Sequence, residues 1–467
     1  MNYQLNNDSK FIQHNKKRSF DSYSFQCFVV SIVKLPHINE FEYQVRYDPL
    51  TYNHLKHFDR YEKEIKYFLK KFVLQHKDFC TFDQIYNYLS GEISNQLELP
   101  NQLLIPILLR TLGLEKIGPL LIDDQIDEIY LDSSKKNLYI DHSKHGRLNT
   151  AIQLTKEEIE SFIYRVALEN DFSLNKSNPT MKSDFVSALF HTRVTVDIPP
   201  LTIEDFHIDI RKFRSNKLRI PDLVNNESLT LNQALLLIFL IQNQVSISII
   251  GPPNSGKTTL QNALIEYIPP HFRLLSIEDV LETTETRQGN IVKFRLGYDP
   301  HESMVLSKSL EIQKILHRSP DFVNLGELST KDNFSAFLNV LSVGIPSIQT
   351  IHGRNPEFLF KRLKDIYGIP LELLKTSFPH IFIELNVSWI RNVKKRAVMR
   401  IAELTNEGKI KTLSEKDFEL FLSHPNSDSG ISTLDFLITH NQISLNKVII
   451  NSKNTALELC KKGHCEI

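Results

Sequence analysis

The hydrophobic and polar positions recur with different periods along the chain, and the changes of period divide it into segments. Residues 58–76 place apolar side chains at helical spacing with lysines and glutamates between them, and the run 103–114 continues a helical pattern. Near residue 127 the pattern becomes strand-like alternation around a polar turn, which predicts a hairpin. The sequence therefore predicts a helical region over 21–117, after a polar, disordered tail over 1–20.

The next segment combines a helix with strands. Thr155 and Glu158 begin the stretch "TKEEIESFIYRVALEN" as the N-cap and capping-box partner of an amphipathic helix. Strand-like alternation follows in "ALFHTRVTVDI" and "FHIDIRKFR". We therefore predict an α+β domain over 118–215, and the polar, proline-containing stretch 216–228 indicates a linker.

Beyond this linker, strand and helix periods alternate. The stretch "VSISIIG" predicts a strand buried on both faces, as in a parallel sheet, and a glycine-containing loop and a helix follow it. The alternation continues to about residue 400, which predicts an α/β domain over 229–400. Residues 401–467 are predicted to form a helical tail.

Composition narrows the class of protein only slightly. The chain has 467 residues, too many for a single core, and its 55 basic and 55 acidic side chains create no global field that attracts nucleic acid or an anionic membrane. The longest apolar run is too short to span a bilayer and the N-terminus lacks the apolar segment of a secretory signal, so any membrane association is expected to come through a partner.

The cysteines do not suggest a disulfide framework. The chain has four, which in a protein of this length favours a reducing cytosol. Cys460, His464 and Cys465 are three potential metal ligands near the C-terminus. Because no fourth ligand follows at standard spacing, a frayed tail is the favoured interpretation.

One loop carries a chemical signature. The stretch "GPPNSGKTT" fits G-x-x-x-x-G-K-[ST] between a predicted strand and a predicted helix. Gly251 and Gly256 let the backbone turn its amide N–H groups around anionic oxygens. Lys257 would bring positive charge to the β- and γ-phosphates of ATP, and Thr258 would offer a hydroxyl to Mg²⁺. The predicted nucleotide-binding residues are Gly251, Pro252, Pro253, Asn254, Ser255, Gly256, Lys257, Thr258 and Thr259.

Three stretches follow this loop: "SIEDVLET" over 276–283, "PDFVNLGEL" over 320–328 and "GIPSIQTIH" over 344–352. In this order and spacing the chain resembles the type II/IV secretion ATPases. Within this family, the short tail and the lack of a CxxC…CxxC insert favour a resemblance to the archaeal flagellar and pilus branch. The resemblance, over roughly 120–400, implies a RecA-like P-loop NTPase domain after an α+β N-terminal domain.

The resemblance also implies roles for individual residues. Glu327, at the end of an apolar strand, would be the Walker B acid that orients the attacking water or the Mg²⁺ shell. Glu282 would be the catalytic acid of an acidic box, and His352 would sense the γ-phosphate. Arg211 and Arg214 would reach a nucleotide across a domain or subunit boundary.

The chain departs from the family pattern where arginines are expected. Ser329 stands two residues after the Walker B acid, and only Arg318 lies in the segment before that strand. A guanidinium that faces the developing charge of phosphoryl transfer changes the rate by orders of magnitude, so hydrolysis is less certain than binding. Arg295, Arg211 or Arg214 would have to compensate.

These observations favour an ATP- and Mg²⁺-dependent hexameric motor in the cytoplasm. It would act at the inner face of the cell membrane through a polytopic membrane platform protein and a pilin- or archaellin-like assembly. The alternative is a nucleotide-binding structural or regulatory paralogue without turnover. No direct nucleic-acid partner is expected, because the chain has no basic stripe with interleaved aromatics and short runs such as "VKKR" indicate solvated faces.

Overall fold

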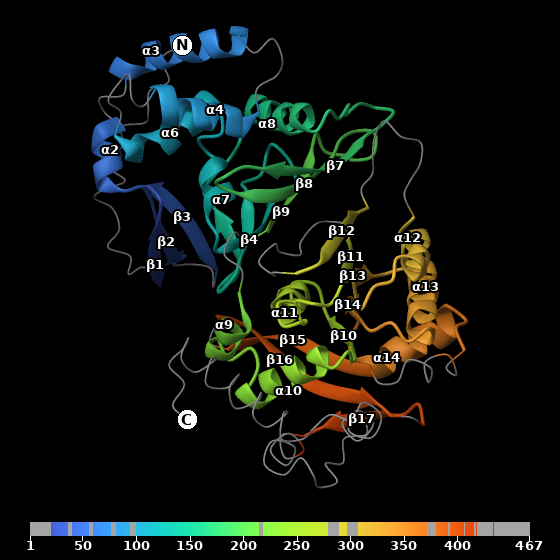
Figure 1. The fold of residues 1–467 in the computed structure, drawn as a ribbon. Helices are drawn as coiled ribbons and strands as arrows, with labels where there is room; N and C mark the ends of the chain where they lie inside the picture. The colour runs from blue at the N-terminus through green and yellow to red at the C-terminus, as the bar shows by residue number, and fades with distance from the viewer. Residues whose placement is uncertain are drawn as a thin grey trace. The chain divides into compact units, whose positions relative to one another are not determined.

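The structure, a computed structural model, describes residues 20–35, 40–55, 59–75, 81–93, 100–213, 218–278, 289–296, 307–370, 373, 380–390, 393–405, 407–414, 417 and 433. The chain divides into two compact units, Met1–Asn216 and Lys217–Ile467. Figure 1 labels most of the helices and strands of the two units.

The described part of unit 1 contains a nine-stranded sheet in the order β1-β2-β3-β6-β5-β4-β9-β8-β7. All neighbouring strands are antiparallel except β3 and β6, which are parallel. The strands are β1 Asp21–Phe25, β2 Phe28–Lys34, β3 Phe41–Tyr47, β4 Ile126–Leu131, β5 Tyr139–His142, β6 Gly146–Thr150, β7 Thr180–Val186, β8 His191–Asp197 and β9 His207–Phe213.

Helices of unit 1 pack against this sheet in one continuous hydrophobic core. They are α2 Pro49–Leu55, α3 Asp59–Gln75, α4 Phe82–Tyr88, α6 Leu104–Thr111, α7 Gly118–Ile122 and α8 Lys156–Glu169. The capping box predicted for α8 is present: Glu158 N donates to Thr155 Oγ1 at 3.3 Å, and Thr155 N donates to Glu158 Oε2 at 2.8 Å.

The prediction of a helical region from residue 21 is wrong for its first part. Residues 21–47 contain β1, β2 and β3, and the first helix begins at Pro49. The reason lies in the side chains of β2, "FVVSIVK", whose β-branched residues alternate between buried and half-buried positions. The first strands and the later α+β segment therefore share one sheet.

Unit 2 is a doubly wound α/β domain with an eight-stranded sheet among its described residues, in the order β12-β11-β13-β14-β10-β15-β16-β17. Its strands are β10 Ser246–Gly251, β11 Leu274–Glu278, β12 Ile291–Arg295, β13 Phe322–Leu328, β14 Ser347–His352, β15 His380–Ile390, β16 Val393–Leu404 and β17 Ile410–Leu413. Its helices are α9 Ile220–Asn225, α10 Leu231–Gln242, α11 Lys257–Ile265, α12 Lys308–Lys314, α13 Lys331–Ser342 and α14 Pro356–Lys361.

The strand order has the RecA-like arrangement. Strands β12 through β15 are parallel, and β14 separates β10 from β13. Helices α9, α10 and α11 cover one face of the sheet and α12, α13 and α14 cover the other, with one hydrophobic cluster on each side. Every residue of β10 is buried, including Ser246 and Ser248, as expected for a strand covered on both faces. The fold class expected from the sequence is confirmed.

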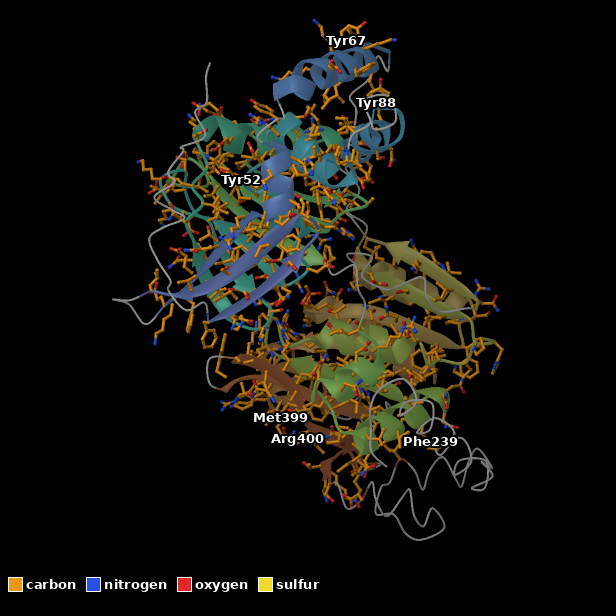
Figure 2. All side chains as sticks on the ribbon, turned by 90° about the vertical axis from the view of Figure 1, so that its left-hand side faces the viewer. Tyr52, Tyr67, Tyr88, Phe239, Met399 and Arg400 are labelled. Carbon is orange, nitrogen blue, oxygen red and sulfur yellow. The ribbon has the colours of Figure 1, made fainter. Side chains whose placement is uncertain are left out.

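A long antiparallel hairpin, β15 and β16, extends the parallel part of the sheet. Its pairing shifts at Met399, an extra residue of β16 that lies between the pairs Leu385–Val398 and Glu384–Arg400. Figure 2 labels Met399 and Arg400 on this strand. The Arg400 guanidinium forms ion pairs with Glu357 of α14 and Glu384 of β15, which fasten the hairpin to the helical layer.

The borders of the predicted ATPase domain also differ from the structure. Residues 220–225 of the predicted linker form α9, whose Ile220 is fully buried in unit 2. The sheet continues past residue 400, because β16 runs to Leu404 and pairs with β17. Most of the predicted helical tail lies outside the described residues. Within the described parts of both units, no helix combines the length and the apolarity needed to cross a bilayer.

An aromatic cluster offers a test of the shared core of unit 1. The ring of Phe185 in β7 lies 6.0 Å from that of Phe82 in α4 and 6.1 Å from that of Phe162 in α8. We expect Phe185→Ala to lower the free energy of unfolding of unit 1 by about 3–5 kcal/mol in urea titrations, because it leaves a cavity where three elements meet. The exposed Leu168 of α8 provides the control: Leu168→Ala should cost less than about 0.5 kcal/mol. Equal losses would contradict the shared core.

Candidate active site at the phosphate loop

The predicted phosphate loop joins β10 to α11 in the expected strand–loop–helix order. At Gly251 a Cβ atom would lie 2.7 Å from the carbonyl oxygen of Leu385, so the loop begins where only glycine fits. Gly256 has a φ of +90° immediately before α11, a conformation that favours glycine. The first amide N–H groups of α11 have no helical acceptor, which suits an anion.

Lys257 lies at the first position of α11, and its side chain is only 6% exposed. Its Nζ atom donates to the carbonyl oxygen of Pro252 at 2.8 Å, so the side chain folds back over the loop. The same Nζ atom lies 3.2 Å from Nδ1 of His352. The ammonium group is therefore held at the phosphate loop, at the end of β14.

Glu327 reaches this site because of a bulge in β13. The pairing of β13 with β14 shifts between Asn324 and Glu327, and Gly326 between them has a φ of +58°. A Cβ atom at Gly326 would approach the carbonyl oxygen of Ile277 to 3.1 Å, so a side chain here would need a shift of β11. The glycine of the predicted Walker B stretch thus serves to turn the acid after it.

His352 connects the lysine to the acid. Its Nε2 atom lies 3.2 Å from Oε1 of Glu327, while Nδ1 faces Lys257. A neutral imidazole with its proton on Nε2 satisfies both contacts, since Nδ1 then accepts from the ammonium and Nε2 donates to the carboxylate. Lys257, Glu327 and His352, which the sequence predicted separately, therefore meet in one bridge.

The charges around Glu327 favour its ionised form. The hydrogen bond with His352 lowers the pKa of the Glu327 carboxyl, and the positive charges of Lys257 and Lys308 act in the same direction. Partial burial opposes this effect without reversing it. The carboxylate is consequently an acceptor near neutral pH.

Two cations of this region were missed in the sequence. Lys308 of α12 is buried, and its Nζ atom donates to the carbonyl oxygen of Glu327 at 2.7 Å. Arg396 of β16 donates from Nε to the carbonyl oxygen of Asn254 at 2.8 Å, so part of the "VKKR" run faces the phosphate loop and not solvent. Lys308 is a lysine, and the family pattern led us to expect arginines before β13. No local sequence pattern indicates that Arg396 contacts the loop.

Arg318, the arginine that the sequence does provide in that segment, is occupied elsewhere. Its Nη2 atom lies 3.1 Å from Glu311 Oε2, and its guanidinium stacks 4.0 Å from the ring centre of Phe294. Glu278 is buried at the end of β11 and is not a solvated loop charge. The other predicted residues cannot be placed at the site: Arg211 is exposed in β9 of unit 1, and Glu282, Arg214 and the C-terminal Cys460, His464 and Cys465 lie outside the described residues.

The loop fits a phosphate chain with a magnesium ion. The Ser255 hydroxyl is buried and has no hydrogen-bond partner among the described residues, which leaves it available to an oxygen ligand. Thr258, half-buried in the first turn of α11, is the candidate hydroxyl ligand for Mg²⁺. These features, with Lys257, fit a nucleotide.

Comparison with known proteins identifies the family of the chain. The family model described as type II/IV secretion system protein matches residues 114–396, more than half of the chain. The fold and the phosphate loop define a P-loop NTPase, and the chain belongs to the type II/IV secretion system protein family.

Individual relatives are similar to this chain over only part of its length. Protein MJ0900 of Methanocaldococcus jannaschii is 24% identical over 302 residues, which are 63% of this chain and 53% of that protein. Protein VirB11 of Rhizobium radiobacter is 37% identical over 126 residues, 26% of this chain and 36% of that protein. The solved ATPase DotB of Yersinia pseudotuberculosis is 15% identical with a TM-score of 0.47, covering 72% of this chain and 93% of that one. The chain thus spans about half or less of the two curated relatives.

The lowered pKa of Glu327 predicts how acid affects the domain. The ionised carboxylate stabilises the folded state above its ordinary pKa of 4.5, and this contribution is lost as the pH falls through the lowered value. We expect the difference in free energy of unfolding between wild type and Glu327→Gln to be constant near neutrality and to shrink below about pH 4.5. Urea titrations across this range measure it, with the His352→Ala background as control, where the fall should be smaller and should end at a higher pH. If the difference in free energy of unfolding grew on acidification, the lowered pKa of Glu327 would be contradicted.

Proposed function

We propose that the chain is an ATP-binding, ATP-hydrolysing motor of a type II/IV secretion-like, pilus or archaellum assembly system. The observation that carries the proposal is the Lys257–His352–Glu327 bridge at the phosphate loop. It joins a phosphate-binding cation, an imidazole and an ionised acid at the carboxyl ends of neighbouring parallel strands. Membership of the secretion family supports the same reading.

The phosphate loop and Glu327 have separate roles in binding and hydrolysis. The amide groups of the loop, Ser255 and Lys257 bind the phosphate chain of ATP, and bound Mg²⁺ would neutralise the charge that develops on the phosphates, with Thr258 as its protein ligand. Glu327 accepts a hydrogen bond from the attacking water and orients it. Lys257 and Glu327 already lie at the loop, so these roles require no large movement of either side chain.

His352 links ligand binding to the acid. The Lys257 ammonium is shared between the Pro252 carbonyl and the His352 imidazole. A γ-phosphate competes for this ammonium because a charged acceptor binds it more strongly than a neutral one. His352 then loses its hydrogen bond with Lys257 and keeps its contact with Glu327. Binding of the phosphate can therefore change the surroundings of the acid through the imidazole.

Positive charge favours turnover over the alternative of a silent paralogue. Lys308 and Arg396 supply cations beside Glu327 and the loop, where arginines of the expected pattern are missing. Glu282, Arg211 and Arg214 remain proposed contributors of the acidic box and of a domain or subunit boundary. We propose a cytoplasmic hexameric ring that acts at the inner face of the cell membrane through a polytopic platform protein and a pilin- or archaellin-like assembly, without direct nucleic-acid contact.

Two variants separate binding from hydrolysis. Lys257→Ala removes the phosphate-binding cation, so it should weaken MgATP binding in calorimetry and lower phosphate release at least about 100-fold. Glu327→Gln keeps the loop, so it should lower kcat about 100-fold while the affinity for MgATP stays within about threefold. Undiminished phosphate release from Lys257→Ala would refute the proposed function.

Lys308 tests whether the chain compensates for the missing arginines. Lys308→Met removes a buried charge beside Glu327 and keeps most of the side-chain volume, so we expect kcat to fall about tenfold with little change in nucleotide affinity. Lys314 on the same helix pairs with Glu311 and is largely exposed, so Lys314→Met should leave kcat within about twofold. Wild-type binding of MgATP without phosphate release, from an assembled oligomer, would instead favour the non-hydrolysing paralogue.

A further inference from the structure

An amide side chain lies in the middle of the Walker B strand. Asn324 is 1% exposed, while its neighbours Val323 and Leu325 and the preceding Phe322 are fully buried apolar residues. Burying an amide without hydrogen bonds is unfavourable, because the group loses its hydrogen bonds with water. An apolar residue would avoid this cost, so the contacts of Asn324 need an explanation.

The carbonyl oxygen of the Asn324 side chain joins two elements of the site. Oδ1 accepts from the backbone N–H of Gly326 at 3.1 Å, inside the bulge that turns Glu327. It also accepts from Nε2 of Gln261 at 2.8 Å. Gln261 belongs to α11, four residues after Lys257, and residues at this spacing lie on the same face of a helix. One oxygen thus connects the helix of the phosphate loop to the bulge.

The amide nitrogen of Asn324 reaches a second acid. Nδ2 donates to Oγ of Ser276 at 2.8 Å and lies 3.4 Å from Oε1 of Glu278, both in β11. The Ser276 hydroxyl in turn donates to the same carboxylate oxygen of Glu278. Glu278 is therefore held in a buried hydrogen-bonded chain at the end of β11, next to Gly326.

We propose that Asn324 is a positioning residue that couples occupancy of the phosphate loop to the orientation of Glu327 and Glu278. The inference rests on the proposed function, because it assigns Asn324 to the hydrolysis step. A small displacement of α11 on phosphate binding moves Gln261, and the shared oxygen of Asn324 transmits the displacement to the Gly326 N–H. A fully satisfied buried network is rigid enough to carry such a shift, whereas an apolar contact is not directional.

Asn324→Leu tests the position directly. It fills the strand with an apolar side chain and leaves the Gly326 N–H, Gln261 and Ser276 without their shared partner. We expect kcat for phosphate release to fall at least tenfold, because the acid is no longer held in line, while KM and the dissociation constant for MgADP change less than about threefold. Wild-type kcat in this variant, or equal losses in kcat and nucleotide affinity, would overturn the proposal.

Gln349→Leu is the matched control. Gln349 is a buried amide in the neighbouring strand β14, and its Nε2 atom donates to Ser248 Oγ at 2.6 Å. It stands opposite the same bulge but belongs to a different hydrogen-bonded group. Gln349→Leu should leave kcat within about twofold, and a loss equal to that of Asn324→Leu would mean that any buried amide of this sheet matters for packing alone.

A measurement without turnover separates this inference from the proposed function. Hydrogen exchange of the wild-type backbone over residues 322–328 should slow when MgADP is added, and Gln261→Leu should bind MgADP but lose at least half of that protection. Gln261→Leu also serves if Asn324→Leu fails to fold. If the wild type releases no phosphate, the proposed function fails, and the exchange result still decides the coupling. Unchanged protection in Gln261→Leu would refute the coupling even in an active enzyme.

Discussion

The site depends on one geometric constraint: parallel strands bring their carboxyl ends to the same edge of a sheet. Gly251 and His352 end β10 and β14, and Glu327 is the last residue but one of β13. These strands are neighbours in the order β13-β14-β10. Residues separated by about a hundred positions in the chain are therefore side by side without any special loop. The helical layers cover both faces of the sheet, and the charged groups of the site gather near the ends of the strands.

A second constraint acts inside β13. A regular strand would point alternate side chains to opposite faces, and Glu327 would follow that alternation. The bulge at Gly326 breaks the alternation, and the close approach of the Ile277 carbonyl leaves little room for a side chain there. The positive φ of Gly326, which glycine adopts without strain, thus directs the carboxylate toward the phosphate loop. Asn324 compensates by accepting the N–H that the bulge removes from the ladder.

Much of the α/β unit could be predicted because its signals are local. The phosphate loop needs two glycines and a lysine between a strand and a helix, and the acid and the histidine each end an apolar run. The parts that were missed depend on contacts between distant segments. Lys308 and Arg396 reach the site from α12 and β16, and nothing in their neighbouring residues indicates the carbonyl groups that they bind. The strands before Pro49 were not predicted, because the helical pattern of the residues that follow them was extended back to residue 21.

The contact of Arg396 with the loop has a consequence for ligand association. Asn254 has a φ of +58°, a conformation that a free chain rarely adopts, and the Arg396 guanidinium is bonded to its carbonyl oxygen. A loop already fixed in this shape gives up little conformational entropy when an anion arrives, so more of the contact energy is left for affinity. Because that guanidinium comes from the β15–β16 hairpin, bending of the hairpin would release the Asn254 carbonyl and weaken the affinity of the loop for an anion.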